Sequence, residues 1–179
     1  MMDIKLVKPG KILHWLNLLL LYLEAFPAAE RKPIHMIISM YRKSKTDIWC
    51  LEKEGKFVGL AITINSADLI LLDYFAIVRS CRCGGIGSKA LRHLQDLYDG
   101  KGFFIEIEST LEDAPNWAQR AKRKQFYLAA GMQELGVTAK LFGVNMELLG
   151  VRCRLTYDAY KRFYKENYNE WASNHIAPT

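Results

Sequence analysis

The chain has 179 residues, of which 50% are hydrophobic, and 25 Lys and Arg residues against 19 Asp and Glu residues give it a formal net charge of +6. This length and apolar content exclude an intrinsically disordered chain and favour one domain over residues 1–179 with its own core. The positive charge favours anionic ligands but does not distinguish phosphates from nucleic acid or a membrane surface.

The N-terminal segment has some features of a secretory signal peptide, because Lys5, Lys8 and Lys11 precede an apolar run that ends at Pro27. The run is too short and too interrupted by polar residues to span a membrane. Its apolar residues recur at helical spacing, which favours instead a helix that buries this stripe in the core. The stripe consists of Ile12, Leu16, Leu19, Leu20 and Leu23.

Alternating hydrophobicity, turn residues and capping signals predict the remaining elements in chain order. The expected strands are 3–7, 47–52, 57–64, 69–78, 102–109, 133–142 and 144–155. The expected helices are 10–26, 34–43, one that follows the glycines at 84–87 and ends near 100, 116–130, and a C-terminal helix at about 157–171.

The strands 69–78 and 102–109 are joined by a helix and are therefore expected to be parallel, whereas hairpins precede and follow them. The fold class expected is α/β, with a mixed, mostly antiparallel central sheet that has one parallel pair and is flanked by helices. On the strand 102–109, alternation places Phe104, Glu106 and Glu108 on one face.

Four cysteines, Cys50, Cys81, Cys83 and Cys153, match neither a zinc-binding spacing nor an evident disulfide pattern. Free thiols in a reducing compartment fit this usage best, so a cytoplasmic protein without a bound metal is expected.

A glycine-rich turn follows the long apolar strand 69–78 and leads directly into a helix. Such a turn leaves backbone N–H groups unpaired at a helix N-terminus, where the helix dipole also favours negative charge. Arg79 and Arg82 flank the glycines and add planar donors suited to phosphate oxygens. The turn therefore predicts a binding site for the phosphate or pyrophosphate of a cofactor.

Three kinds of phosphate-binding turn compete for this interpretation. A P-loop would need GxxxxGK followed by Ser or Thr, and the segment lacks it. The sequence GIGSKA, beginning at Gly85, fits the dinucleotide fingerprint GxGxxA, and Glu106 or Glu108 lies at about the right distance for a ribose contact. Against that interpretation, the residues RSCRC separate the strand from the glycines, and hairpins flank the unit instead of parallel repeats.

The third interpretation depends on two segments taken together. The sequence RCGGIG from Arg82 fits the pattern Q/R-x-x-G-x-G/A at the end of a long strand, and QFYLAAGM from Gln125 resembles a later FYxxxGF segment. With the order of the elements, these segments resemble the GNAT superfamily of N-acetyltransferases. The resemblance extends from Asp3 to about Leu155. It departs from the family pattern at Arg120, where many members have an asparagine.

The resemblance implies acetyl-CoA as co-substrate, no metal, and direct attack by a primary amine of a small molecule or peptide. The turn would hold the pyrophosphate, and the pantetheine arm would pair with the end of the long strand, where the parallel pair splays apart. The cofactor-binding residues implied in this way are Ala76, Ile77, Val78, Arg82, Cys83, Gly84, Gly85, Ile86, Gly87 and Ser88.

Tyr127 in the second segment is, by the same resemblance, the general acid for the departing CoA thiolate. A phenol titrates near pH 10, so it is still protonated at neutral pH and can donate to the sulfur. A base must also deprotonate the acceptor ammonium. Asp73, Glu106 and Glu108 are the candidates because they interrupt apolar strands, and Glu106 is marginally favoured. A water relay is left open.

Two alternative functions remain at this stage: an acyl-CoA-binding module without catalysis and, less favoured, a dinucleotide-binding protein. The basic run RAKRK, from Arg120 to Lys124, raises nucleic-acid binding as a third possibility, but it is expected to be a solvated helix face. No nucleic-acid or membrane partner is expected. The oligomeric state is open, with a homodimer as one option, and the acceptor amine is not predicted.

Overall fold

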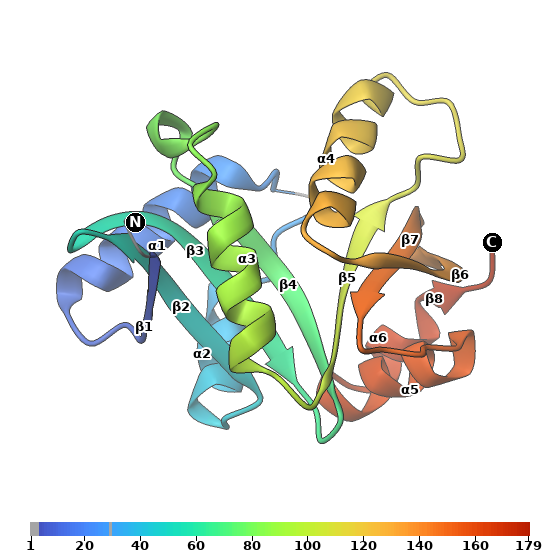
Figure 1. Ribbon diagram of the computed structural model, residues 1–179. Coiled ribbons are helices and arrows are strands. Elements are labelled where there is room, and N and C mark those ends of the chain that lie inside the picture. Colours follow the sequence, from blue (N-terminus) through green and yellow to red (C-terminus); the bar gives the residue numbers. More distant parts are fainter. Residues whose placement is uncertain (1–3, 29) are drawn as a thin grey trace. The chain divides into compact units, whose positions relative to one another are not determined.

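The computed structural model describes residues 4–28 and 30–179 (Figure 1). Asp3, the first residue of the expected N-terminal strand, lies outside this part of the chain. The strands are β1 (Ile4–Val7), β2 (Thr46–Lys53), β3 (Lys56–Asn65), β4 (Leu69–Ile77), β5 (Gly102–Glu108), β6 (Gln133–Leu141), β7 (Val144–Val151) and β8 (Ile176–Ala177). The helices are α1 (Ile12–Ala25), α2 (Ile34–Arg42), α3 (Ile86–Leu97), α4 (Trp117–Ala129), α5 (Tyr157–Asn167) and α6 (Glu170–Asn174), with a short 3-10 turn η1 (Arg79–Cys81).

The strands form a mixed sheet in the order β1-β2-β3-β4-β5-β7-β6-β8. The pair β4–β5 is parallel, whereas β1–β2, β2–β3, β5–β7, β6–β7 and β6–β8 are antiparallel. The predicted α/β class is therefore confirmed, as is the single crossover through α3. One parallel pair between antiparallel hairpins is not the run of parallel strands that a dinucleotide-binding fold needs.

Two compact units make up the chain. The first contains the described residues of Met1–Asn65 together with Leu72–Asp99, and the second contains Ser66–Leu71 and Gly100–Thr179. The parallel pairing lies inside the second unit, where Leu69–Leu71 of β4 pair with Gly102–Phe104 of β5. The rest of β4 belongs to the first unit. A single domain over residues 1–179 stays a prediction.

In the first unit, α1 and α2 cover one face of β2, β3 and β4, and Figure 1 shows α3 on the opposite face. Every second residue of each strand faces α1 and α2, as the two-residue period of a strand requires. The buried core of this face consists of Leu18, Leu21, Tyr22, Ile37, Ile48, Cys50, Leu60, Ile62, Tyr74 and Ala76. On α3, the predicted face is buried at Ala90, Leu91 and Leu94, but Leu97 is 49% exposed.

The prediction that the apolar stripe of α1 faces the core is wrong, because the stripe faces outward. Ile12 is 81% exposed and Leu20 is 66% exposed, while Leu18, Leu21 and Tyr22 are buried. The prediction failed because α1 is apolar on nearly every side, so helical spacing alone did not distinguish the packed stripe from the open one. On the packed side of α1, the Tyr22 hydroxyl donates a hydrogen bond to the Lys32 carbonyl oxygen at 3.0 Å.

In the second unit, Phe104 of β5 packs edge-to-face against Tyr160 and Phe163 of α5, with ring centroids 6.4 and 5.2 Å apart. The predicted C-terminal helix is divided in two, because Tyr168 leaves the helical region with ψ −85° and the Asn169 side chain accepts a hydrogen bond from the Ala172 amide to cap α6. The strand expected to reach residue 155 ends at Val151, and β8 was not predicted.

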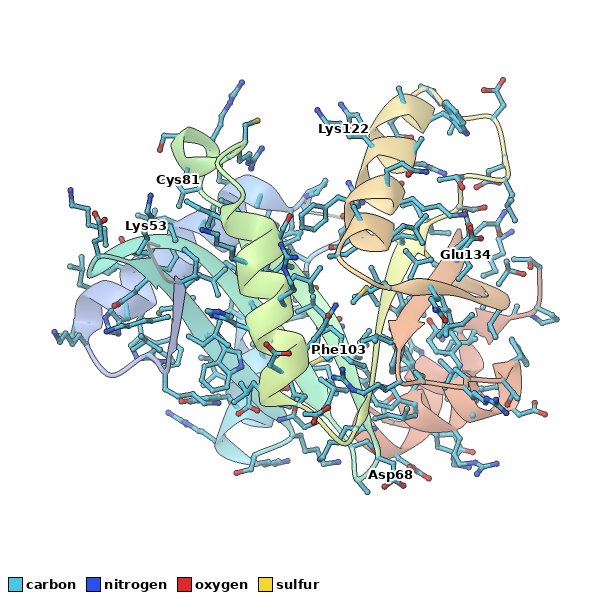
Figure 2. The ribbon with its side chains drawn as sticks, in the orientation of Figure 1. Lys53, Asp68, Cys81, Phe103, Lys122 and Glu134 are labelled. Atoms are coloured by element: carbon cyan, nitrogen blue, oxygen red, sulfur yellow. The ribbon has the colours of Figure 1, made fainter. Side chains whose placement is uncertain are left out.

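Ion pairs join α4 to the strands beside it in the second unit. Lys124 Nζ lies 2.5 Å from Glu147 Oε2, and Thr110 Oγ1 donates to Glu147 Oε1 at 2.7 Å. Burial alone would raise the pKa of Glu147, but the hydrogen bonds from Lys124 and Thr110 outweigh it and lower that pKa. The RAKRK run is therefore not only a solvated face: Lys124 is 11% exposed, whereas Lys122 is exposed (Figure 2).

Within the described residues, no helix combines the length and the apolar character needed to cross a bilayer. The four cysteines are all free thiols, and Cys50 is the buried one.

We predict that Glu147→Gln lowers the free energy of unfolding by about 2 kcal/mol near neutral pH, because it weakens a charged hydrogen-bond network in a buried setting. Since the folded-state pKa of Glu147 is lowered, its contribution is present above the ordinary value of 4.5 and is lost as the pH falls through the folded-state pKa. The mutational effect should therefore shrink in acid. Urea unfolding from pH 3 to 8 measures it.

Glu134→Gln is the matched control, because the Glu134 side chain also binds Lys124 but is 57% exposed. It should change stability by less than about 0.5 kcal/mol. Equal losses for the two variants, or a Glu147→Gln effect that does not depend on pH, would contradict this assignment.

Candidate functional site

The turn between β4 and α3 has a backbone that exposes amide groups. Cys83 and Gly85 adopt the left-handed region, with φ 65° and 72°, and α3 begins directly afterwards at Ile86. No side chain caps this helix at Gly85, and the first hydrogen bond within it runs from the Lys89 amide to the Gly85 carbonyl at 3.1 Å. The N–H groups of residues 86–88 precede that bond, so the helix itself cannot satisfy them. This geometry suits an anion.

Arg82 ties this turn to the end of β4. Its Nε donates to the Ile77 carbonyl oxygen at 3.0 Å, and the side chain is otherwise exposed. The guanidinium thus belongs to the same turn as these N–H groups, and its remaining planar donors lie on an exposed side chain.

Alternation along β4 distinguishes among the three strand residues expected to bind a cofactor. The Val78 amide donates to the Val58 carbonyl at 2.9 Å, and the Ala76 carbonyl approaches Gly59 so closely that a Cβ there would lie 2.5 Å from it. Residues 76 and 78 therefore direct their backbone groups toward β3. Because neighbouring residues of a strand alternate, the N–H of Ile77 points away from β3. Ile77 is the donor left to meet a ligand.

A hollow of about 430 Å³ lies beside the turn in the first unit, between it and the β2–β3 hairpin. Three cations line it, Lys53, Lys56 and Arg82, against one acidic residue, Glu54. Lys53 and Cys81, both labelled in Figure 2, are among the residues that line this hollow. Sequence analysis missed the lysines because they belong to a hairpin without a motif.

The side chain of Asp73 is buried in the first unit. Its side chain is 6% exposed, and its Oδ1 lies 2.5 Å from the Nζ of Lys32 in the loop between α1 and α2. The second oxygen, Oδ2, is buried and has no hydrogen-bond partner among the described residues. The neighbouring Tyr74 keeps its proton, because burial and the Asp73 charge raise the pKa of its hydroxyl. No sequence signal links Lys32 to a residue 41 positions away.

The other two carboxylates are engaged within the second unit. Glu106 Oε1 accepts hydrogen bonds from the hydroxyls of Tyr160 and Tyr164 at 2.7 and 2.8 Å. Glu108 forms ion pairs with Arg120 at 2.9 Å and with Arg123 at 3.4 Å. Arg120, which departs from the resemblance, therefore has a structural partner.

Tyr127 lies near the C-terminal end of α4 and is 9% exposed. Burial raises the pKa of its phenol to about 12, and the Arg123 charge opposes the shift only in part. The ring packs against Phe126 with centroids 5.1 Å apart, and the Tyr127 carbonyl accepts the Met132 amide at 3.2 Å, which closes the helix end. The hydroxyl is thus a proton donor at neutral pH.

A metal has no evident place in this arrangement. Among residues 4–28 and 30–179, no cluster of three or more His, Cys, Asp and Glu side chains is placed to hold one. The chemistry offered by the residues above is anion binding, proton donation and proton acceptance.

Comparison with known proteins gives a consistent result. The sequence model of the acetyltransferase (GNAT) family matches residues 15–122, which is more than half of the chain. None of the curated protein sequences matches the chain.

Solved structures resemble the fold at low sequence identity. A protein assigned to the GNAT family from Bacteroides thetaiotaomicron has a TM-score of 0.78 and 15% identity, over 94% of this chain and 98% of that one. Arabidopsis thaliana Naa50, in complex with the bisubstrate analogue CoA-Ac-MVNAL, has a TM-score of 0.63 and 13% identity, over 84% and 99%. The ribosomal-protein-S18-alanine N-acetyltransferase of Escherichia coli has a TM-score of 0.57 and 16% identity, over 87% and 96%. At such identities the likeness concerns the fold alone.

We predict that Gly85→Ala weakens the binding of inorganic pyrophosphate about tenfold, because a side chain at φ 72° strains the backbone that aims the amides. Phosphorus NMR titration measures the dissociation constant. Gly100→Ala is the matched control, since φ is 84° at that glycine and a Cβ there also meets nothing within 4 Å. Equal affinities in the two variants would show that the turn does not hold the anion.

Proposed function

Because the chain belongs to the GNAT family of acetyltransferases, we propose that it transfers the acetyl group of acetyl-CoA to a primary amine of a peptide or small molecule. The observation that carries this proposal is the turn at residues 82–88, with its left-handed glycine, its uncapped helix and the arginine beside it. Two further acetyltransferase structures that match the fold hold CoA and acetyl-CoA.

The residues present fit this co-substrate. The amides of residues 86–88 and the Arg82 guanidinium would hold its pyrophosphate, and the Ile77 N–H would pair with its extended arm. The cationic hollow beside the turn is a further place for phosphate charge. Bound acetyl-CoA supplies the thioester that an amine attacks. The expected splaying of β4 and β5 stays a prediction.

We assign proton donation to Tyr127. A phenol with a pKa of about 12 keeps its proton throughout the physiological range and can donate a hydrogen bond to a departing thiolate. Its burial excludes water that would compete for that hydrogen bond.

We assign proton acceptance to Asp73 in preference to Glu106 and Glu108. The unpartnered Oδ2 of Asp73 is free to take a proton from an ammonium, while Lys32 keeps the carboxylate in place through Oδ1. Glu106 accepts hydrogen bonds from two phenols, and both oxygens of Glu108 form ion pairs with guanidinium groups, so these two side chains are engaged by protein partners. A water relay from Asp73 is compatible with this assignment.

The acceptor is proposed only as a class. Two of the matching structures are named for acetylation of a peptide-like substrate or a ribosomal-protein alanine, which supports an amine at a peptide N-terminus. A small-molecule amine stays open.

A non-catalytic acyl-CoA-binding protein is the second candidate. The observation in its favour is that all three carboxylates already have protein partners. Such a protein would bind CoA and show no acetyl transfer to any amine.

Tyr127→Phe should reduce kcat for acetyl transfer by about 100-fold or more and leave the dissociation constant for CoA unchanged, because only the proton donor is removed. Thiol release against a panel of peptide and small-molecule amines measures the rate, and calorimetry measures binding. Tyr157→Phe, which loses one hydrogen bond to the Ile176 carbonyl, is the control and should keep full activity. If the wild-type protein binds CoA but acetylates no amine, the second candidate stands.

Asp73→Asn should lower kcat/KM by about 100-fold below the pKa of the acceptor amine, and the loss should shrink at higher pH where the amine is already neutral. Glu106→Gln and Glu108→Gln should change kcat/KM less than tenfold at every pH. A larger pH-dependent loss in either glutamate variant would transfer the role of base to that residue.

A further inference from the structure

A primary ammonium group of the protein itself already contacts the proposed base. Lys32 Nζ lies 2.5 Å from Asp73 Oδ1, and the two side chains are 20% and 6% exposed. An acceptor amine has to reach this same carboxylate before it can give up its proton. The Lys32 amine therefore lies where the proposed reaction needs an acceptor.

Two tyrosine hydroxyls hold the backbone of Lys32 on either side. The Lys32 amide donates a hydrogen bond to the Tyr74 hydroxyl at 2.9 Å, and the Tyr22 hydroxyl donates to the Lys32 carbonyl oxygen at 3.0 Å. Tyr74 in turn donates to the Glu30 carbonyl oxygen at 2.9 Å. Both tyrosines are buried, so they anchor the loop between α1 and α2 with Lys32 beside β4. The amine is thus positioned before any substrate binds, which favours an intramolecular reaction.

A second buried lysine, Lys124, forms an ion pair of the same length, but its carboxylate is engaged at both oxygens. Lys124 Nζ lies 2.5 Å from Glu147 Oε2, and Glu147 Oε1 accepts a hydrogen bond from Thr110 Oγ1 at 2.7 Å. The Oδ2 atom of Asp73 instead has no hydrogen-bond partner among the described residues. Asp73 therefore keeps an oxygen that can take a proton while Lys32 is bound, and Glu147 does not.

The direction of β4 relates Lys32 to the proposed co-substrate site. In that site the pyrophosphate lies at the amides of residues 86–88, the arm pairs with the Ile77 N–H, and the thioester is at the far end of the arm. Asp73 precedes Ile77 by four residues on β4, which is about 13 Å of extended strand. An arm that continues along the strand from the turn past Ile77 therefore carries the thioester towards the Lys32 amine.

We propose, on the basis of the proposed acetyl transfer, that Lys32 is an internal acceptor and that the protein acetylates its own Lys32 Nζ. The Lys32 ammonium gives one proton to Asp73, which later releases it to water. The neutral nitrogen forms a bond to the acetyl carbonyl carbon, and the bond from that carbon to sulfur breaks. The second amine proton leaves with the sulfur, so the products are an amide at Lys32 and the CoA thiol.

Peptide mass spectrometry of the full chain incubated with acetyl-CoA tests the proposal. Lys32 should gain an acetyl group at least about tenfold faster than Lys124 or Lys165, because a positioned amine beside a base outweighs exposure. Lys124 is the matched buried lysine, and Lys165 is 58% exposed. The first-order rate constant should not depend on the protein concentration, since the reaction is intramolecular.

Acetyl N-hydroxysuccinimide, used without acetyl-CoA, shows how the same lysines react when no co-substrate is bound. This reagent should modify the exposed Lys165 faster than Lys32 or Lys124, because solvent reaches it more readily. Fastest reaction at Lys32 with this reagent would overturn the proposal, because the selectivity would then belong to the amine alone.

Substitutions distinguish an acceptor lysine from one that only forms an ion pair. Lys32→Arg keeps a cation for Asp73 but removes the amine, so the intact protein should lose the fast gain of one acetyl group. Lys124→Arg is the matched control and should gain that group at the wild-type rate. Asp73→Asn should slow acetylation of Lys32 about 100-fold near neutral pH, and the loss should shrink in alkali, where the amine is neutral without a base. The comparison among lysines of the wild-type chain decides the matter if Asp73→Asn does not fold.

Thiol release with the amine panel, measured on the same samples, separates this proposal from the proposed function. A protein that acetylates an external amine but leaves Lys32 unmodified would overturn the internal acceptor and leave the proposed function in place. Absence of both reactions would overturn both. Acetylation of Lys32 no faster than that of Lys124 and Lys165, or a rate constant that rises with protein concentration, would also overturn the internal acceptor.

Discussion

Backbone amides that the helix α3 cannot satisfy are the feature on which the functional account depends. Left-handed conformations at Cys83 and Gly85 precede α3, whose first N–H groups have no hydrogen-bond acceptor within the helix. The Arg82 side chain donates a hydrogen bond to the Ile77 carbonyl oxygen, which links this turn to the end of β4. The same alternation that pairs Ala76 and Val78 with β3 leaves the Ile77 amide for a ligand. In the proposed site, contacts to the co-substrate would therefore come mainly from the backbone, with few side chains.

The largely buried carboxylates that form ion pairs divide into two kinds. Glu147 with Lys124 and Glu108 with Arg120 have complementary partners and join α4 to the neighbouring strands, which is a structural role. Asp73 differs because one of its buried oxygens has no partner. A buried oxygen without a partner carries a free-energy penalty, which a bound ammonium or water would relieve. That difference, rather than proximity in sequence, separates a candidate base from a structural carboxylate.

Much of the fold could be predicted from the sequence because local patterns and order of elements agree. The glycine turn and the helix that follow a long apolar strand allowed the parallel crossover to be predicted. Turn residues such as Gly55 and Gly143 allowed the two hairpins to be predicted. The side of α1 that packs could not be predicted, since an almost wholly apolar helix has no polar face to orient it. The break at Tyr168 had a local signal, the capping residue Asn169, which continuous aromatic periodicity concealed. The pair Lys32–Asp73 depends on the tertiary path of a loop and has no signature at either residue.

Hydrogen–deuterium exchange with and without acetyl-CoA tests the central claim most directly, because it reports on backbone amides one segment at a time. The account predicts that the co-substrate slows exchange in the peptides that contain Ile77 and residues 86–88, while the amides of β2 are unaffected. Unchanged exchange in those two segments under saturating acetyl-CoA, with protection elsewhere, would contradict it.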